Sequence, residues 1–197
     1  MMFHPDEKLA MFIDGANFYG TAKSLDFDID YKSLLAYFSA KGRMIKAFYF
    51  TALRENDDFS PLRPLLDWLD YNGFHIVTKP AKTFTDRDGR TRIKGDMDIE
   101  ITVKMLELAP HVDHILLFSG DGDFKAAVEA VQKLGVRVTV VSSLAIKPSL
   151  LADELRRQAD GFIEIDDLER EVGRPKRERE DRSETRYDDD EDDYGYE

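Results

Sequence analysis

Four aspartates stand out in this sequence because each lies where an apolar run ends or a helix is expected to begin. Asp14 closes the segment MFID, Asp121 and Asp123 follow the segment LLFSG, and Asp98 lies within KGDMDIE. Carboxylates that are brought together repel one another, so a fold that gathers them favours a bound cation. Carboxylate oxygens suit hard divalent ions. The pattern therefore predicts a site for Mg²⁺ or Mn²⁺, formed by Asp14, Asp98, Asp121 and Asp123.

The neighbours of these aspartates are small or polar. Residues 15–16 are Gly-Ala, which allow a ligand to approach the backbone closely, and Asn17 could orient Asp14 or a bound water. Each position also has a structural interpretation. Asp14 and Asp123 are good helix N-caps, and Ser119 is a common turn residue. At this stage both interpretations stay open.

The segment from Lys94 to Glu100 presents the same ambiguity. Asp96, Asp98 and Glu100 fall in the first turns of an expected helix, where the helix dipole favours carboxylates in any case. Lys94 beside them suggests a phosphate contact or a charge partner for the acids.

Composition limits the class of protein. The chain has 197 residues, 42% of them apolar, which is enough for the core of one domain. It has no cysteine, which excludes disulfides and thiolate zinc sites. No apolar stretch is long enough to span a membrane, and the N-terminus does not resemble a secretory signal, so we expect a soluble cytoplasmic protein. His111 and His114 flank an expected turn and should be solvated.

Charge is distributed unevenly along the chain. The net charge is −12, which alone argues against a nucleic-acid partner. However, residues 79–94 form a basic segment that could face phosphates. It contains Lys79, Lys82, Arg87, Arg90, Arg92 and Lys94 against only Asp86 and Asp88.

The last part of the chain differs from the rest. Residues 174–197 carry six basic and eleven acidic side chains and no aliphatic one, so we expect a disordered tail that follows a domain spanning residues 1–173. The tail could simply aid solubility, or its final acidic block could bind a protein partner or compete with RNA for the basic segment.

Apolar runs alternate with helical patterns between residues 9 and 166, which form the expected core of the domain. This alternation predicts an α/β fold with a mostly parallel sheet covered by helices on both faces. Ligands of such folds gather at the carboxyl ends of the strands. The expected strands are 9–13, 43–53, 74–78, 114–118, 136–141 and 162–165, and the expected helices are 31–39, 61–72, 95–109, 123–134 and 149–158, with a loop or hairpin at 83–91.

Three segments resemble the NYN-domain family, and within it the LabA-like branch, which is related to the PIN-like nucleases. They are FIDGANFYG (12–20), KGDMDIEITVKML (94–106) and LLFSGDGDFKAAVEAVQKLGVRVTVVS (116–142). The resemblance implies a PIN-like three-layer α/β/α sandwich and a metal-dependent ribonuclease activity. It also implies that Asp98, rather than Asp96, joins the metal ligands, and that Asn17 supports Asp14.

One departure from the family pattern concerns Lys104. Many relatives carry a further aspartate at this position, six residues after Asp98, and a lysine there puts a second metal ion, and with it the activity, in doubt. Under the ribonuclease interpretation the four aspartates hold the ions, and Asn17, Ser119 and the basic side chains contact RNA. Those basic side chains are Lys94, Arg92 and Arg90, with Phe84 as a base-stacking candidate.

Two other functions remain compatible with the sequence. One is a PIN-like RNA-binding or regulatory module that has lost catalysis. The other is a metal-dependent phosphatase or nucleotide hydrolase, although neither an Asp-x-Asp-x-Thr motif nor a Walker loop is present. A homodimer is compatible with the family but has no direct sign in the sequence.

Overall fold

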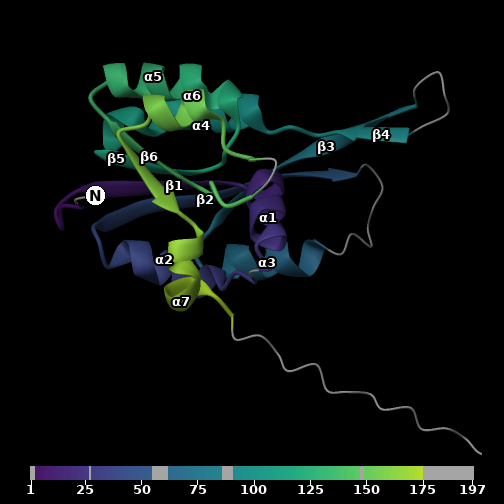
Figure 1. The fold of residues 1–197 in the computed structure, drawn as a ribbon, viewed down its shortest axis with the longest axis horizontal. Coiled ribbons are helices and arrows are strands. Elements are labelled where there is room, and N and C mark those ends of the chain that lie inside the picture. The colour runs from purple at the N-terminus through teal and green to yellow at the C-terminus, as the bar shows by residue number, and fades with distance from the viewer. Residues whose placement is uncertain (1–2, 27, 55–61, 86–90, 147–148, 175–197) are drawn as a thin grey trace, which may run out of the picture.

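A mostly parallel sheet lies between two layers of helices in the computed structural model (Figure 1). The model describes residues 3–26, 28–54, 62–85, 91–146 and 149–174. Within them the strand order is β4-β3-β2-β1-β5-β6-β7, and β4 alone runs antiparallel to its neighbour. The strands are β1 (Lys8–Asp14), β2 (Arg43–Arg54), β3 (His75–Thr85), β4 (Thr91–Lys94), β5 (His114–Phe118), β6 (Arg137–Ser142) and β7 (Gly161–Glu164).

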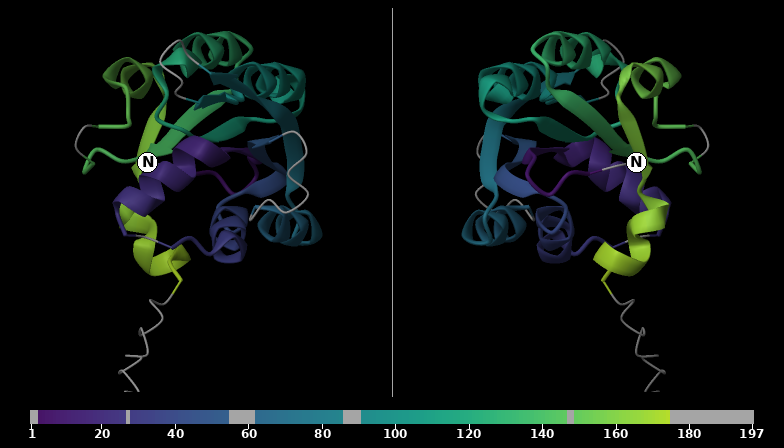
Figure 2. Two further views of the ribbon diagram at one scale, coloured as in Figure 1. Left: turned by 90° about the vertical axis from the view of Figure 1, so that its right-hand side faces the viewer. Right: turned by 90° about the vertical axis from the view of Figure 1, so that its left-hand side faces the viewer.

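Helices α4, α5 and α6 cover one face of the sheet, and α1, α2, α3 and α7 cover the other (Figures 1 and 2). Among the described residues, no helix is long and apolar enough to cross a membrane. The α-helices are α1 (Gly15–Ser24), α2 (Tyr31–Ser39), α3 (Arg63–Tyr71), α4 (Asp98–Leu108), α5 (Lys125–Lys133), α6 (Asp153–Gln158) and α7 (Glu169–Val172). Short 3₁₀ turns are η1 (Ala109–His111), η2 (Gly122–Phe124) and η3 (Asp166–Leu168).

The order of the strands determines where a ligand can bind. From β1 in the middle, the chain adds β2, β3 and β4 on one side and later β5, β6 and β7 on the other. β1 and β5 are therefore parallel neighbours although they are far apart in sequence, with Ile13 opposite Phe118. Their carboxyl ends meet where the direction of strand addition reverses, which is the usual ligand position in open α/β sheets. Asp14 and Ser119 lie at this point.

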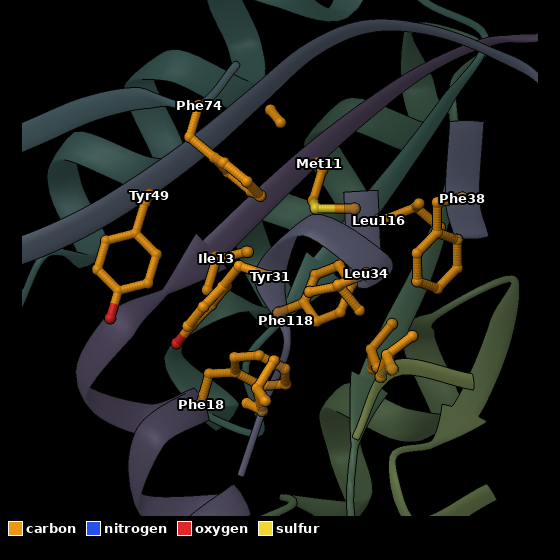
Figure 3. Close-up of a cluster of buried hydrophobic side chains, with 14 of the residues drawn as sticks. Met11, Ile13, Phe18, Tyr31, Leu34, Phe38, Tyr49, Phe74, Leu116 and Phe118 are labelled. Atoms are coloured by element: carbon orange, nitrogen blue, oxygen red, sulfur yellow. The ribbon is translucent and has the colours of Figure 1, made fainter. Parts of the chain in front are cut away.

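β1 is buried because helices pack on both of its faces. Met11 and Ile13 contact the layer of α1, α2, α3 and α7, and Ala10 and Phe12 contact the layer of α4, α5 and α6. Aromatic rings fill much of the first layer (Figure 3). The ring of Phe118 there lies 5.0 Å from that of Phe18 and 5.7 Å from that of Phe38, measured between centroids. This core fixes the end of β5 beside β1.

The expected α/β architecture is confirmed, and two elements have the expected bounds. The helix at Tyr31–Ser39 begins after Asp30, whose carboxylate accepts hydrogen bonds from the backbone of Lys32 and Ser33, and the strand at His114–Phe118 is continuous. Other bounds differ. The third strand extends to Thr85 because β2 and β4 pair with it in succession.

The helix expected from residue 95 begins only at Asp98. A Cβ on Gly95 would collide with the side chain of Ala52, so this segment passes close to β2 before the helix can start. The helix expected at 149–158 is likewise shorter, because Ser149 forms a turn with Leu151. The turn α7 and its preceding η3 were not expected. The acidic tail lies outside the described residues, apart from Arg174.

The expectation that His114 is solvated was wrong. Only 1% of His114 is exposed, because it is the first residue of β5 rather than part of a loop. Its Nε2 lies 2.7 Å from Oγ1 of Thr139, and the ring of Phe3 stacks on it. Burial, and then the charge of Arg137, lower the pKa of His114. This histidine therefore belongs to the packing of the amino edge of the sheet.

We predict that Phe118→Ala strongly destabilises the protein, since the ring is fully buried between two others. The free energy of unfolding should fall by about 3–5 kcal/mol, measured by urea denaturation. Leu134→Ala is the control, because that side chain is 56% exposed and its removal should cost less than about 0.5 kcal/mol. A loss below about 1 kcal/mol for Phe118→Ala would contradict the packing described above.

Candidate active site

Asp14 is the last residue of β1 and also the N-cap of α1. Its Oδ1 accepts a hydrogen bond from the backbone N–H of Asn17 (3.2 Å), and its Oδ2 accepts one from the hydroxyl of Ser119 (3.2 Å). Only 8% of the residue is exposed. Burial raises the pKa of Asp14, and the nearby charge of Asp121 adds to the rise, although the hydrogen bonds oppose it. Asp14 is thus both a cap and a carboxylate held in a fixed direction.

The turn after β5 is hydrogen-bonded to the same place. The hydroxyl of Ser119 also accepts a hydrogen bond from the backbone N–H of Asp121 (3.2 Å). Oδ1 of Asp121 in turn accepts one from the backbone N–H of Asp123 (3.0 Å). Ser119 is only 1% exposed, and its hydroxyl joins Asp14 to the backbone of Asp121.

Asn17 joins the first helix to this turn. Its side-chain oxygen accepts a hydrogen bond from the backbone N–H of Gly120, at 3.0 Å. A Cβ on Gly120 would collide with the carbonyl group of Leu150, so this position must be glycine for the turn to pack as it does. The side chain of Asn17 therefore holds α1 and the β5 turn in one arrangement, whereas only its backbone N–H contacts Asp14.

Asp98 lies at the start of α4, which packs against β1 and η2. Its pKa is raised to about 6. Burial is the largest cause, followed by the charges of Asp121 and Asp14, then those of Asp96 and Asp123. The start of α4 thus lies close enough to Asp14 and to the turn of Asp121 and Asp123 for their charges to oppose ionisation of Asp98.

The other two acids of this segment have a structural partner. Nζ of Lys79, on β3, lies 2.8 Å from Oε2 of Glu100 and 3.8 Å from Oδ1 of Asp96. Lys79 was counted among the cations that could face phosphates, but its ammonium is engaged with the start of α4. Lys79 therefore offsets part of the negative charge of Asp96 and Glu100, although the charge of Asp96 still acts on Asp98.

Lys104 extends away from the cluster. Its Nζ donates a hydrogen bond to Oε2 of Glu107 at 2.6 Å, and Glu107 lies further along α4 from Asp98. The ammonium group of Lys104 is therefore engaged with a neighbour on its own helix.

The chemistry of the donors fits a hard divalent cation. All four candidates are carboxylates, and two of them, Asp14 and Asp98, have a pKa raised in part by the charges of other acids. Nevertheless, no group of three acidic or histidine side chains in the described part of the chain is already arranged to hold a metal ion. A cation would have to draw the carboxylates together, and relief of their repulsion would favour that movement.

The predicted RNA-binding cations lie on or next to β4. Lys94 is the last residue of that strand and Arg92 lies within it, opposite Phe84 of β3. Arg90 lies outside the described residues. For Arg92 and Lys94 the structure describes the backbone alone. In Figure 1 the β3–β4 pair extends beyond the carboxyl edge of the sheet, the same edge at which the aspartates gather.

Two residues near the site were not predicted from the sequence. Oε1 of Glu154, in the first turn of α6, lies 2.8 Å from the place where a Cβ of Gly122 would be, between Asp121 and Asp123 in the chain. Tyr19 is exposed on α1, five residues after Asp14. No spacing rule connects Glu154 to the cluster, because its position depends on how α6 packs. Tyr19 could have been noticed as an aromatic residue within the FIDGANFYG motif.

The NYN domain model matches residues 8–166, which include all four aspartates. The chain belongs to the NYN family. This family is nuclease-like and associated with RNA, and the match confirms the resemblance drawn from the three sequence motifs.

Two relatives support the assignment. The chain is 33% identical over 172 residues to the low amplitude and bright protein LabA of Synechococcus elongatus, covering 85% of this chain and 88% of LabA. A solved structure of a protein of unknown function from Vibrio parahaemolyticus has a TM-score of 0.67 and 32% identity. The likeness covers 85% of this chain and 98% of the Vibrio chain, so the NYN fold accounts for nearly all of that relative.

We predict that Asp98→Asn stabilises the metal-free NYN domain at neutral pH. In the folded protein the pKa of Asp98 is about 6, above its ordinary value of 3.8. Between these values the folded state holds more protons than the unfolded state, so stability falls as the pH rises. Asparagine removes this decline, and the variant should exceed the wild type by about 1 kcal/mol at pH 7, after allowance for solvent screening.

The measurement is urea denaturation in EDTA at several values between pH 4 and pH 7. The advantage of the variant should grow across this range. Asp70→Asn, on the exposed part of α3, is the control and should show no such pH dependence. An Asp98→Asn variant that is less stable than the wild type at pH 7 would show that the carboxylate is not under repulsion.

We also predict that Mn²⁺ or Mg²⁺ raises the melting temperature of the NYN domain. An ion at 100 times its dissociation constant adds about 2.7 kcal/mol to the stability, which corresponds to roughly 5–10 °C for a domain of this size. The shift should be small in Asp14→Asn and Asp121→Asn and should persist in Asp70→Asn. Equal shifts in all of these proteins would indicate that the ion binds elsewhere. The measurement is differential scanning fluorimetry with an EDTA reference.

Proposed function

We propose that this NYN domain is a metal-dependent ribonuclease that hydrolyses RNA phosphodiester bonds at the carboxyl edge of its sheet. The observation that carries the proposal is the meeting of Asp14 with the turn of Asp121 at the carboxyl edge, where the hydroxyl of Ser119 bonds to both and α4 brings Asp98 alongside. Four mutually repelling carboxylates at a strand-order reversal are costly for the fold, and a bound divalent cation is the simplest means of offsetting that cost.

Asp14, Asp98, Asp121 and Asp123 would hold the Mg²⁺ or Mn²⁺. When bound, such an ion would supply a water of lowered pKa and positive charge at the scissile phosphate. The contribution of the protein is to orient the carboxylate groups. Ser119 and the backbone of Asn17 fix the two oxygens of Asp14, and the hydroxyl of Ser119 also fixes the backbone of Asp121. These contacts keep the carboxylates in place while the substrate is exchanged.

The substrate proposed for this site is RNA. Lys94, Arg92 and Arg90, on and beside β4, would hold its phosphates, and Phe84 on β3 would stack on a base. Because Lys79 is already paired with Glu100 and Asp96, it is left out of this set. Asn17 and Ser119 support the site by hydrogen-bonding to Gly120 and to Asp14, respectively.

A second candidate function is an RNA-binding or regulatory module without catalysis. One observation favours it: among the described residues, no three acidic or histidine side chains are already arranged to hold a metal ion. The replacement of a further acid by Lys104 points in the same direction. The two functions make opposite statements about cleavage, so a single assay separates them.

We predict that the wild-type protein cleaves a 5′-labelled single-stranded RNA in Mn²⁺ or Mg²⁺, and that EDTA abolishes the reaction. Asp121→Asn should reduce the rate by at least about 100-fold, because removal of one aligned charged group at a reaction centre commonly costs this much. Asp70→Asn is the matched control and should cleave at the wild-type rate. Each rate is measured from the amount of shortened product that accumulates with time on denaturing gels.

Three other outcomes are informative. RNA binding without cleavage, unchanged in Asp121→Asn, would reject the ribonuclease and favour the binding module. Cleavage that survives in Asp121→Asn would assign the activity to a contaminant or to another site. Release of phosphate from mononucleotides, with RNA left intact, would favour a phosphatase.

A further inference from the structure

Helix α1 presents an aromatic side chain to solvent close to the aspartates. Tyr19 is 58% exposed, although large apolar side chains of this domain are mostly buried. It lies five residues after Asp14, which at the rise of an α-helix is roughly 7.5 Å along the axis. In the left view of Figure 2, which looks onto the carboxyl edge, α1 lies across the front of the sheet. Tyr19 is therefore an exposed ring on the helix that Asp14 caps.

The charge of α1 distinguishes it from the rest of the acidic edge. The helix GANFYGTAKS contains no acidic residue, and Lys23 is its one charged side chain. Nζ of Lys23 lies 5.9 Å from the ring centroid of Tyr19, which is at the outer limit of a cation–π contact. Because Asp14, Asp98, Asp121 and Asp123 would repel a polyanion, this helix offers RNA a neutral to basic approach.

Gly20, the next residue, is a second and independent observation. A glycine inside a helix costs about 1 kcal/mol relative to alanine. A Cβ at Gly20 would meet no atom within 4 Å in the described structure, and the residue is not among those with a positive φ. Neither packing within the chain nor the backbone conformation therefore requires glycine here. A ligand that lies close against the helix would explain it.

We propose that Tyr19, Gly20 and Lys23 form a stacking platform for a base of single-stranded RNA whose chain passes over the aspartates. The inference rests on the proposed action on RNA and adds the residues that would hold one of its bases. Aromatic rings next to cations are the usual means of binding single strands, because every base has a face that can stack. A duplex keeps its bases stacked on one another and cannot use the platform in this way.

The test measures the binding of a fluorescein-labelled oligouridine RNA by fluorescence anisotropy in Mg²⁺. The full-length protein carries Asp121→Asn throughout, so that the RNA is not cleaved. Tyr19→Ala should weaken binding about 10-fold, since stacking on an aromatic side chain contributes roughly 1–3 kcal/mol per base. Tyr19→Phe keeps the ring and should bind within about twofold of its parent.

Two further variants examine the neighbours of Tyr19. Lys23→Gln should weaken binding and reduce the slope of log K against log salt concentration by about 1, as expected for the loss of one phosphate contact. Gly20→Ala should raise the melting temperature, because alanine is the better helix former, and should nevertheless weaken RNA binding. A purely structural role for Gly20 would not produce these opposite effects.

The matched control is Tyr71→Ala. Tyr71 is 92% exposed on α3 and close to the end of that helix, so it tests whether any exposed tyrosine affects RNA binding. Binding by Tyr71→Ala should equal that of the parent. Tyr19→Ala should bind an RNA duplex of the same length at least as tightly as the parent does.

The inference is overturned if Tyr19→Ala binds the single strand as well as its parent does, or if the parent binds no RNA. It is also overturned if Tyr19→Ala alters only the oligomeric state, measured by light scattering, because Tyr19 would then contact a second copy of the chain. Failure of the ribonuclease is a separate result: wild-type protein would bind RNA through Tyr19 without cleaving it. Conversely, cleavage by the wild type combined with unchanged binding by Tyr19→Ala would reject only the platform.

Discussion

The parallel pairing of β1 with β5 is the contact on which the rest of the arrangement depends. It pairs Ile13 with Phe118, although these residues are about a hundred positions apart in the chain. The residues that follow them, Asp14 and Ser119, therefore lie beside each other. The hydroxyl of Ser119 reaches Asp14 for this reason. The core around Phe118 and the glycine turn at Gly120 preserve that register. The carboxyl edge therefore acquires its carboxylates from the topology of the sheet.

The edge is a compromise between folding and chemistry. Asp14 stabilises the start of α1 through its hydrogen bond to Asn17, yet burial and the charge of Asp121 raise its pKa. Asp98 lies under similar repulsion, whereas Asp96 and Glu100 are compensated by Lys79. The fold thus gives Asp96 and Glu100 a cationic partner and leaves Asp14 and Asp98 exposed to the charge of other acids.

Local patterns predicted much of the fold, and contacts between distant residues account for the differences. The cap at Asp30 and the apolar run HILLF are local signals, and the bounds of α2 and β5 followed from them. The start of α4 did not, because the proximity of Gly95 to Ala52 is a contact across the sheet. The motifs selected the four aspartates, but the pairing of Lys79 and the position of Glu154 depend on packing that no spacing in the sequence encodes.

The segment between β6 and α6 is fastened to the turn that carries Asp121. The backbone N–H of Ala152 donates to the carbonyl oxygen of Gly120 at 2.8 Å, and the carbonyl of Leu150 closes over the same glycine. Both contacts use backbone atoms of Leu150 and Ala152. The side chains at these two positions could therefore change while the contact with Gly120 is kept.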